Sequence, residues 1–177
     1  MRLRQRPPID QGAVPWLLAV ALATASPHAE NLPPWLSLLF AAALLWRAWL
    51  WRQRRPLPPR WGLALLVLGA LAGIAWHYRS LLGRDSGVAM LVLFMALKPL
   101  EMNTRRDALV VVMLGFFLLL THYFYSQSIP TGIWLLASCT LLTAALIRLH
   151  GGAQPLADIV RQAGLLLLQA LPFMLIL

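Results

Sequence analysis

The densest group of side chains that could do chemistry flanks a short apolar run in the segment 83–107. Two sets of residues stand there: Gly83, Arg84, Asp85 and Gly87 before the run, and Lys98, Glu101, Thr104, Arg105, Arg106 and Asp107 at and after its end. Charged side chains inside a bilayer are costly, so they are expected to lie at membrane surfaces or to pair with one another. The pattern therefore predicts a membrane hairpin with a polar end on each side.

The residues of the second set, from Lys98 to Asp107, can be explained by contacts that stabilise helices, without a catalytic role. Lys98 and Glu101 stand three residues apart, a spacing that allows an ion pair within one helix. Thr104 and Asp107 have the spacing of a capping box, which favours a role for Asp107 at the start of a helix over a role as a catalytic carboxylate.

The GRDSG segment has two open interpretations: it contacts a substrate, or it fixes a turn. Gly83 and Gly87 favour a turn, in which Arg84 and Asp85 neutralise each other.

No other side chains form a recognisable catalytic or metal site. Cys139 lies within an apolar run, whereas a reactive thiol needs an electropositive, partly exposed setting. His77 and His122 each precede a tyrosine, and we expect them to be interfacial anchors because two separated pairs do not form a metal-ligand set. We therefore assign no catalytic residue, cofactor or metal to this sequence.

Gly69 and Gly73 form a G-x-x-x-G pattern, which lets two membrane helices approach closely. Packing inside one helical bundle is favoured over dimerisation, because several other helices are available as neighbours.

Composition places the chain among membrane proteins. Hydrophobic residues make up 60% of the 177, charged residues only 12%, and the mean hydropathy is +0.70. The net charge of +9 raises the possibility of nucleic-acid binding, but the basic residues are spread between apolar runs and form no stripe with interleaved aromatic residues. Nucleic acid is not an expected partner.

Seven apolar stretches predict an all-α integral membrane protein, a single domain 1–177 with six or seven transmembrane helices. The predicted spans are 13–25, 35–51, 61–78, 87–100, 108–125, 131–147 and 163–177. Arg47 lies within the second stretch, and its long side chain is expected to reach the membrane surface. The last stretch has no polar flank, and we expect it to be a span cut short.

The first stretch has an alternative interpretation. The basic residues before it, its apolar core and the small residues at 23–25 also fit a cleavable secretory signal. The proline-containing turn that follows leads directly into another apolar stretch, which fits a helical hairpin equally well.

The distribution of basic residues predicts the orientation. With a cytoplasmic N-terminus, thirteen Lys and Arg residues fall on the cytoplasmic side and only Arg79 and Arg84 on the outer side. Seven crossings then place the C-terminus outside.

The ordered motifs GRDSGVAMLVLFMALKPLEMNTRRD, LGFFLLLTHYFYSQSIPTG and ALIRLH resemble the N-terminal membrane domain of the TgpA-type bacterial transglutaminase-like proteins. The resemblance is strong over 32–150. It implies several helices in the bacterial inner membrane, followed by a periplasmic transglutaminase-like domain with a Cys, His and Asp triad, one more helix and a cytoplasmic tail.

The sequence offers no positions onto which that triad can be carried, so we expect this chain alone to lack a catalytic site, although the family it resembles is transglutaminase-like. The periplasmic domain is expected downstream. The favoured function is an anchor or scaffold that holds a periplasmic catalytic domain at the membrane. Expected partners are the lipid bilayer, the downstream domain and cell-wall or envelope material. The alternative is a small transporter or channel, which would require intramembrane charges that face a cavity.

Overall fold

A computed structural model of the chain describes residues 11–79, 83–126, 128–151 and 154–176, with side chains as far as residue 170. In this part of the chain the structure is entirely helical. Two short 3-10 helices, η1 (Gln11–Ala13) and η2 (Ser26–Asn31), flank the first of seven α-helices: α1 (Val14–Ala25), α2 (Pro34–Arg52), α3 (Arg60–Tyr78), α4 (Arg84–Glu101), α5 (Arg105–Tyr123), α6 (Ile129–Gly151) and α7 (Leu156–Ile176).

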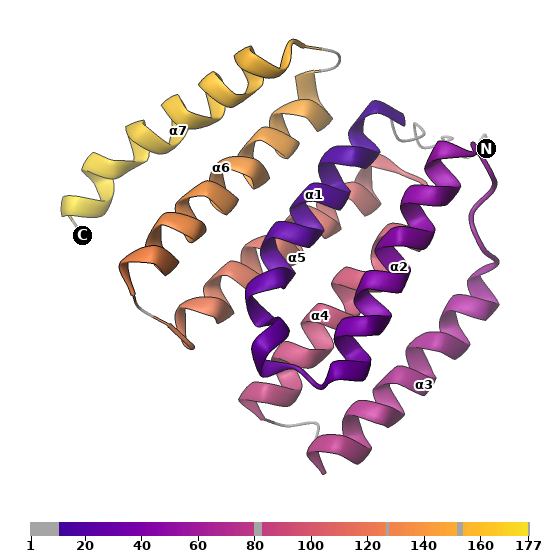
Figure 1. Cartoon of the computed structure of the whole chain (residues 1–177). Helices are drawn as coiled ribbons and strands as arrows, with labels where there is room; N and C mark the ends of the chain where they lie inside the picture. Colours follow the sequence, from indigo (N-terminus) through magenta and orange to yellow (C-terminus); the bar gives the residue numbers. More distant parts are fainter. Residues whose placement is uncertain (1–10, 80–82, 127, 152–153, 177) are drawn as a thin grey trace, which may run out of the picture.

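The helices lie side by side in a bundle around α4 and α5 (Figure 1). Helix α4 packs against α2, α3 and α5, while α5 also packs against α1 and α6. Helix α7 packs on α6, with Ala144, Ile159 and Ala163 buried between them. Because α4 has neighbours on most sides, much of its apolar length is buried, including Val92, Leu93 and Met95.

The all-helical prediction is confirmed, but several helices extend beyond the predicted stretches. Helix α4 begins at Arg84 instead of residue 87, and α7 begins at Leu156 instead of residue 163. Apolar stretches mark only the part of a helix that avoids water, whereas the first turn of a membrane helix can hold polar residues at the surface.

Among the described residues, four helices are long and apolar enough to cross a membrane: α2, α3, α5 and α6. Helix α1 has only 12 residues, which span about 18 Å at 1.5 Å per residue, less than a hydrocarbon core of about 30 Å. The predicted number of six or seven crossings therefore stays a prediction.

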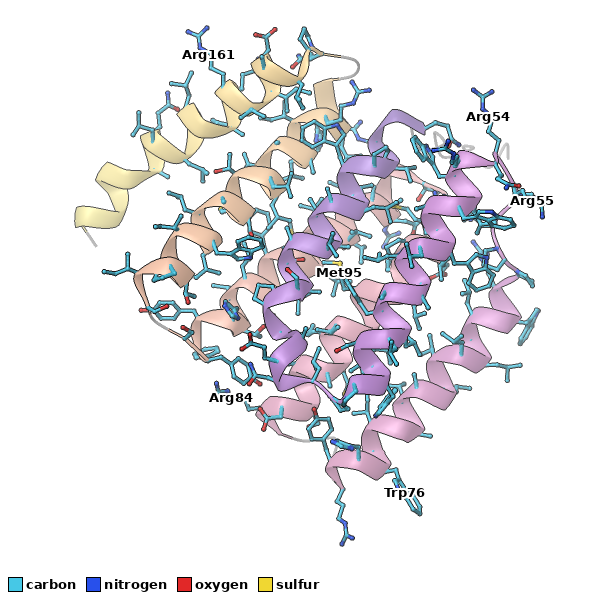
Figure 2. All side chains as sticks on the ribbon, in the orientation of Figure 1. Arg54, Arg55, Trp76, Arg84, Met95 and Arg161 are labelled. Carbon is cyan, nitrogen blue, oxygen red and sulfur yellow. The ribbon has the colours of Figure 1, made fainter. Side chains whose placement is uncertain are left out.

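The outer surface of the bundle carries large apolar side chains. Trp61 and Trp76, near the two ends of α3, are 85% and 89% exposed, and Leu65 between them is 72% exposed. Figure 2 shows Trp76 pointing away from the bundle. The two tryptophans are separated by about 22 Å along the helix, which suits aromatic anchors at opposite faces of a bilayer. Such a surface is stable in lipid and would be costly in water.

Charge is distributed unequally between the ends of the bundle. The end where α2, α4 and α6 finish and α3, α5 and α7 begin is called the basic end. In or beside it stand ten of the described Lys and Arg residues: Arg47, Arg52, Arg54, Arg55, Arg60, Lys98, Arg105, Arg106, Arg148 and Arg161. The opposite end carries two, Arg79 and Arg84.

Candidate functional site

The structure separates the residues of the 83–107 segment into two polar clusters, one at each end of α4. The basic-end cluster consists of Lys98, Glu101, Thr104 and Asp107. The opposite-end cluster consists of Arg84 and Asp85 together with Tyr125, which sequence reasoning did not include. Asp85 and Lys98, the nearest members of the two clusters in sequence, are 13 residues apart on α4, about 20 Å along the helix, so the clusters cannot form one site.

In the basic-end cluster Lys98 lies between two carboxylates. Its Nζ is 3.3 Å from Glu101 Oε2 and 3.3 Å from Asp107 Oδ1. The pairing with Glu101 was predicted from spacing, whereas that with Asp107 joins α4 to α5. All three side chains are partly exposed, so each pair contributes no more than about 1 kcal/mol to stability.

The predicted capping box at the start of α5 is present. The Asp107 amide donates to Thr104 Oγ1, and Asp107 Oδ2 accepts from the Thr104 amide at 3.0 Å. Asp107 therefore has several structural partners at the α4–α5 connection. Arg105 is half-buried and Arg106 exposed in the same first turn.

The GRDSG segment is the start of a helix, whereas its two glycines are suited to a turn; whether it contacts a substrate stays a prediction. Gly83 is the N-cap of α4, and its carbonyl accepts a hydrogen bond from the Gly87 amide at 2.9 Å. Arg84, Asp85 and Gly87 lie in the first turn of α4. An acidic residue in the first turn is favoured there because it faces the positive end of the helix dipole.

Arg84 and Asp85 both bind the α5–α6 connection, in place of the expected mutual pairing. The Tyr125 hydroxyl donates to Asp85 Oδ1 at 2.7 Å, while the Arg84 guanidinium lies 3.9 Å from the centroid of the Tyr125 ring. Arg84 also donates to the Phe124 carbonyl at 2.6 Å. The start of α4 is thus tied to the end of α5, 40 residues later in the sequence.

The Tyr125 phenol is held in its protonated form. Burial raises the pKa of Tyr125 to about 12, with the hydrogen bond to Asp85 and the Asp85 charge acting in the same direction against the opposing effect of Arg84. Tyr125 therefore remains a hydrogen-bond donor throughout the physiological pH range.

A buried histidine, His28, lies beside Tyr125 at the same end of the bundle as the opposite-end cluster. His28, in η2 between α1 and α2, has no solvent exposure, and its Nε2 lies 3.1 Å from Thr121 Oγ1. The rings of His28 and His122 have centroids 5.1 Å apart. Sequence reasoning treated His122 as an anchor paired with Tyr123 and did not consider His28, although both stand at helix ends that the predicted topology places on the same side.

Burial lowers the pKa of His28 to about 4, and the charge on a protonated His122 lowers it further, against a hydrogen bond at the Thr24 backbone that raises it. His28 is therefore neutral at ordinary pH.

Arg47 is buried, which corrects the expectation that its side chain reaches the membrane surface. It is 5% exposed, and its Nε donates to the Pro99 carbonyl at 2.8 Å. That carbonyl belongs to the last turn of α4, where helix carbonyls have no partner within the helix. A cation at this position also interacts favourably with the negative end of the α4 dipole.

The two glycines of the G-x-x-x-G pattern have different surroundings. A Cβ built at Gly73 would lie 3.2 Å from the Trp35 ring of α2, whereas one built at Gly69 would meet nothing within 4 Å. Gly73 thus permits a contact inside the bundle, and Gly69 faces open space.

The described part of the chain contains no group of three or more His, Cys, Asp and Glu residues that could hold a metal ion. Cys139 is half-buried in α6. Within these residues, the polar clusters bind helix ends to one another and leave the outer faces of the helices apolar.

Fold and charge together define a class: a helical bundle with membrane-spanning features, joined by polar clusters at its two ends. Residues 16–177 match the model of the TgpA N-terminal domain. The chain belongs to this family. It is 38% identical over 172 residues to a protein-glutamine gamma-glutamyltransferase of Pseudomonas aeruginosa strain PAO1, in a match that covers 96% of this chain. The chain spans 26% of the length of that relative, and no solved structure matches it.

Proposed function

We propose that this chain is the multi-pass membrane region that anchors a transglutaminase-type catalytic region at the outer face of a bacterial inner membrane. Membership of the TgpA N-terminal domain family supports the proposal that this chain is the membrane region of a transglutaminase-type protein. The relative in Pseudomonas aeruginosa is named for glutamine gamma-glutamyl transfer, and this chain corresponds to 26% of its length. The remaining length of that protein has room for the catalytic region.

The observation that carries the proposal is the contrast between the two ends of an apolar bundle. Ten of the described Lys and Arg residues lie in or beside the basic end, and two lie at the other. Basic residues in short connections stay in the cytoplasm, so the basic end is the cytoplasmic end. The opposite end, with the Arg84, Asp85 and Tyr125 contacts, then faces the periplasm.

The path of the last helix supports an outer position for whatever follows the chain. Helix α7 begins beside the basic end and runs antiparallel to α6, so that it finishes near the start of α6 (Figure 1). With seven crossings, a domain that follows Leu177 is delivered to the periplasm. There it could act on cell-wall or envelope material, and the bundle itself has the bilayer as its partner.

The transporter alternative receives less support. Its substrate path would need polar groups at several depths of the bundle. The described charged side chains gather instead at the ends of the helices, and the middle of α4 is filled by apolar residues such as Leu93 and Met95.

Reporter fusions test the proposal. Alkaline phosphatase fused after Leu177 through a protease-cleavable linker is expected to be active, to resist carbonate extraction, and to become soluble only after cleavage. A fluorescent protein that folds only in the cytoplasm should be fluorescent when inserted in the 53–59 connection and dark when fused after Leu177. Fluorescence without phosphatase activity at Leu177, or extraction of the intact fusion by carbonate, would contradict the proposal.

A further inference from the structure

A cavity of about 850 Å³ opens at the basic end of the bundle, beside the end of α2. Its walls come from three separate segments: η1, the end of α2 with the connection that follows, and the Met102 and Asn103 link between α4 and α5. The volume lies within the range of about 300–1,000 Å³ that is usual for small-molecule sites. No contact described above accounts for this cavity.

The charged side chains among the cavity's described lining residues are all positive. Among the described residues that line it are four arginines, Arg47, Arg52, Arg54 and Arg55, and no acidic residue. The acids of the neighbouring basic-end cluster, Glu101 and Asp107, both lie 3.3 Å from Lys98. Their charges are therefore partly neutralised by a residue outside the cavity, and the net positive charge of the lining residues favours an anion.

The backbone holds two of these arginines in a fixed turn. The Arg55 amide donates to the Leu50 carbonyl and the Arg54 amide to the Trp51 carbonyl, which is the Schellman arrangement for ending a helix. Arg54 has φ of 50° in this turn, a conformation usually taken by glycine. A glycine at this position would relieve the backbone but would remove a cation from the cavity.

Other contacts fix the remaining walls. Arg47 is held at the C-terminal end of α4 by its hydrogen bond to the Pro99 carbonyl. Trp51 Nε1 donates to the Gln11 carbonyl at 2.9 Å, and this hydrogen bond attaches η1 to α2. The Arg55 guanidinium lies 4.9 Å from the centroid of the Trp49 ring. Figure 2 shows Arg54 and Arg55 at this end of α2, with the Arg54 side chain projecting away from the bundle.

We propose that this cavity binds the phosphate-bearing headgroup of an anionic phospholipid, whose acyl chains lie along the outer face of α2. Guanidinium groups are the side chains best suited to bind phosphate through paired hydrogen bonds. Basic pockets between membrane helices on the cytoplasmic side suit such headgroups. A lipid is favoured over free phosphate because the α2 surface beside the cavity is apolar and open: Leu45 is 71% exposed, and Trp46 and Trp49 are 42% and 43% exposed.

Native mass spectrometry of the detergent-purified chain tests this site, with dioleoylphosphatidylglycerol, dioleoylphosphatidylcholine and inorganic phosphate as probes. The wild type should retain phosphatidylglycerol in preference to phosphatidylcholine. The double variant R54Q/R55Q should weaken phosphatidylglycerol binding at least about tenfold, since each basic residue at an anionic lipid surface contributes about fivefold.

The control variant R106Q/R161Q removes the same charge from the basic end at residues that do not line the cavity. It should leave binding within about threefold of wild type. Circular dichroism and gel filtration check folding. If R54Q/R55Q does not fold, the single variant R55Q replaces it, with an expected loss of about fivefold.

Three results would overturn the proposal: unchanged binding in R54Q/R55Q, equal losses in the two double variants, or full displacement of phosphatidylglycerol by equimolar inorganic phosphate. The last result would identify a free-phosphate site. The site requires only that α2 lies in a bilayer, so this experiment and the reporter fusions after Leu177 can fail independently.

Discussion

At the scale of single residues, Tyr125 explains why two opposite charges next to each other in sequence do not pair. In the first turn of a helix, adjacent side chains point in different directions, so Arg84 and Asp85 reach separate partners. The Tyr125 hydroxyl binds the Asp85 carboxylate at 2.7 Å, and the Tyr125 ring faces the Arg84 guanidinium. One aromatic side chain thus serves both charges and fixes α4 against α5.

His28 gives a pH-dependent stability prediction. Its pKa in the folded chain is lowered from 6.5 to about 4, so between these values the unfolded chain binds more protons than the folded chain. Stability therefore rises with pH through this window and falls as the solution is acidified from pH 6.5 towards pH 4. The contribution of His28 to the slope approaches about 1.4 kcal/mol per pH unit within the window.

Thermal unfolding in detergent at a series of pH values from 4 to 7 would measure this slope. The variant His28→Gln should flatten it, whatever its effect on stability at pH 7. His77→Gln, at an exposed histidine, is the matched control and should keep the wild-type slope. Because the His122 ring lies beside that of His28, part of the slope should remain in His28→Gln. An unchanged slope in His28→Gln would refute the assignment.

At the scale of helices, the connection between α4 and α5 depends on Asp107. Its carboxylate accepts from the Asn103 and Thr104 amides and lies within ion-pair distance of Lys98. We expect Asp107→Ala to cost about 1–2 kcal/mol, because it removes both a cap and an ion pair. Asp107→Asn should cost less, since an amide oxygen can still accept from the backbone.

Hydrogen exchange of the amides at 103–110, together with the unfolding midpoint in detergent, would test this prediction. Asp158→Ala removes an exposed acid from the first turn of α7 and serves as the control. The Asp107 variant should exchange faster at the start of α5, and the control should not. Equal exchange in the two variants would show that Asp107 does not hold the start of α5.

The helices could be predicted from the sequence, while most contacts between them could not. Apolar stretches located all seven helices, and the T-x-x-D spacing identified the cap of α5, because both signals are local. The contacts of Asp85 with Tyr125 and of His28 with Thr121 join residues 40 and 93 positions apart. They depend on how the helices rotate about their axes, which an apolar stretch does not specify. Arg47 was misjudged because its partner is a backbone carbonyl, which leaves no sequence signal.

At the scale of the whole molecule, α5 comes close to three neighbouring helices at Gly115. A Cβ built at this residue would lie 2.6 Å from Leu142 of α6, 3.4 Å from Val20 of α1 and 3.5 Å from Met95 of α4. Four helices therefore meet around one residue without a side chain. Leu142 and Met95 have no solvent exposure, so a large side chain at Gly115 would push against residues of the core.

Substituting Gly115 should separate these helices. We expect Gly115→Leu to destabilise the bundle by about 1–3 kcal/mol or more through overpacking, and Gly115→Ala to cost less because only the end of the Leu142 side chain must shift. Gly69→Leu, at a helical glycine with nothing within 4 Å, is the control and should change stability by no more than about 0.5 kcal/mol. Unfolding midpoints of the three variants in the same detergent would give the comparison. If Gly115→Leu and Gly69→Leu have the same midpoint, then α1, α4, α5 and α6 do not meet at Gly115 as the structure places them.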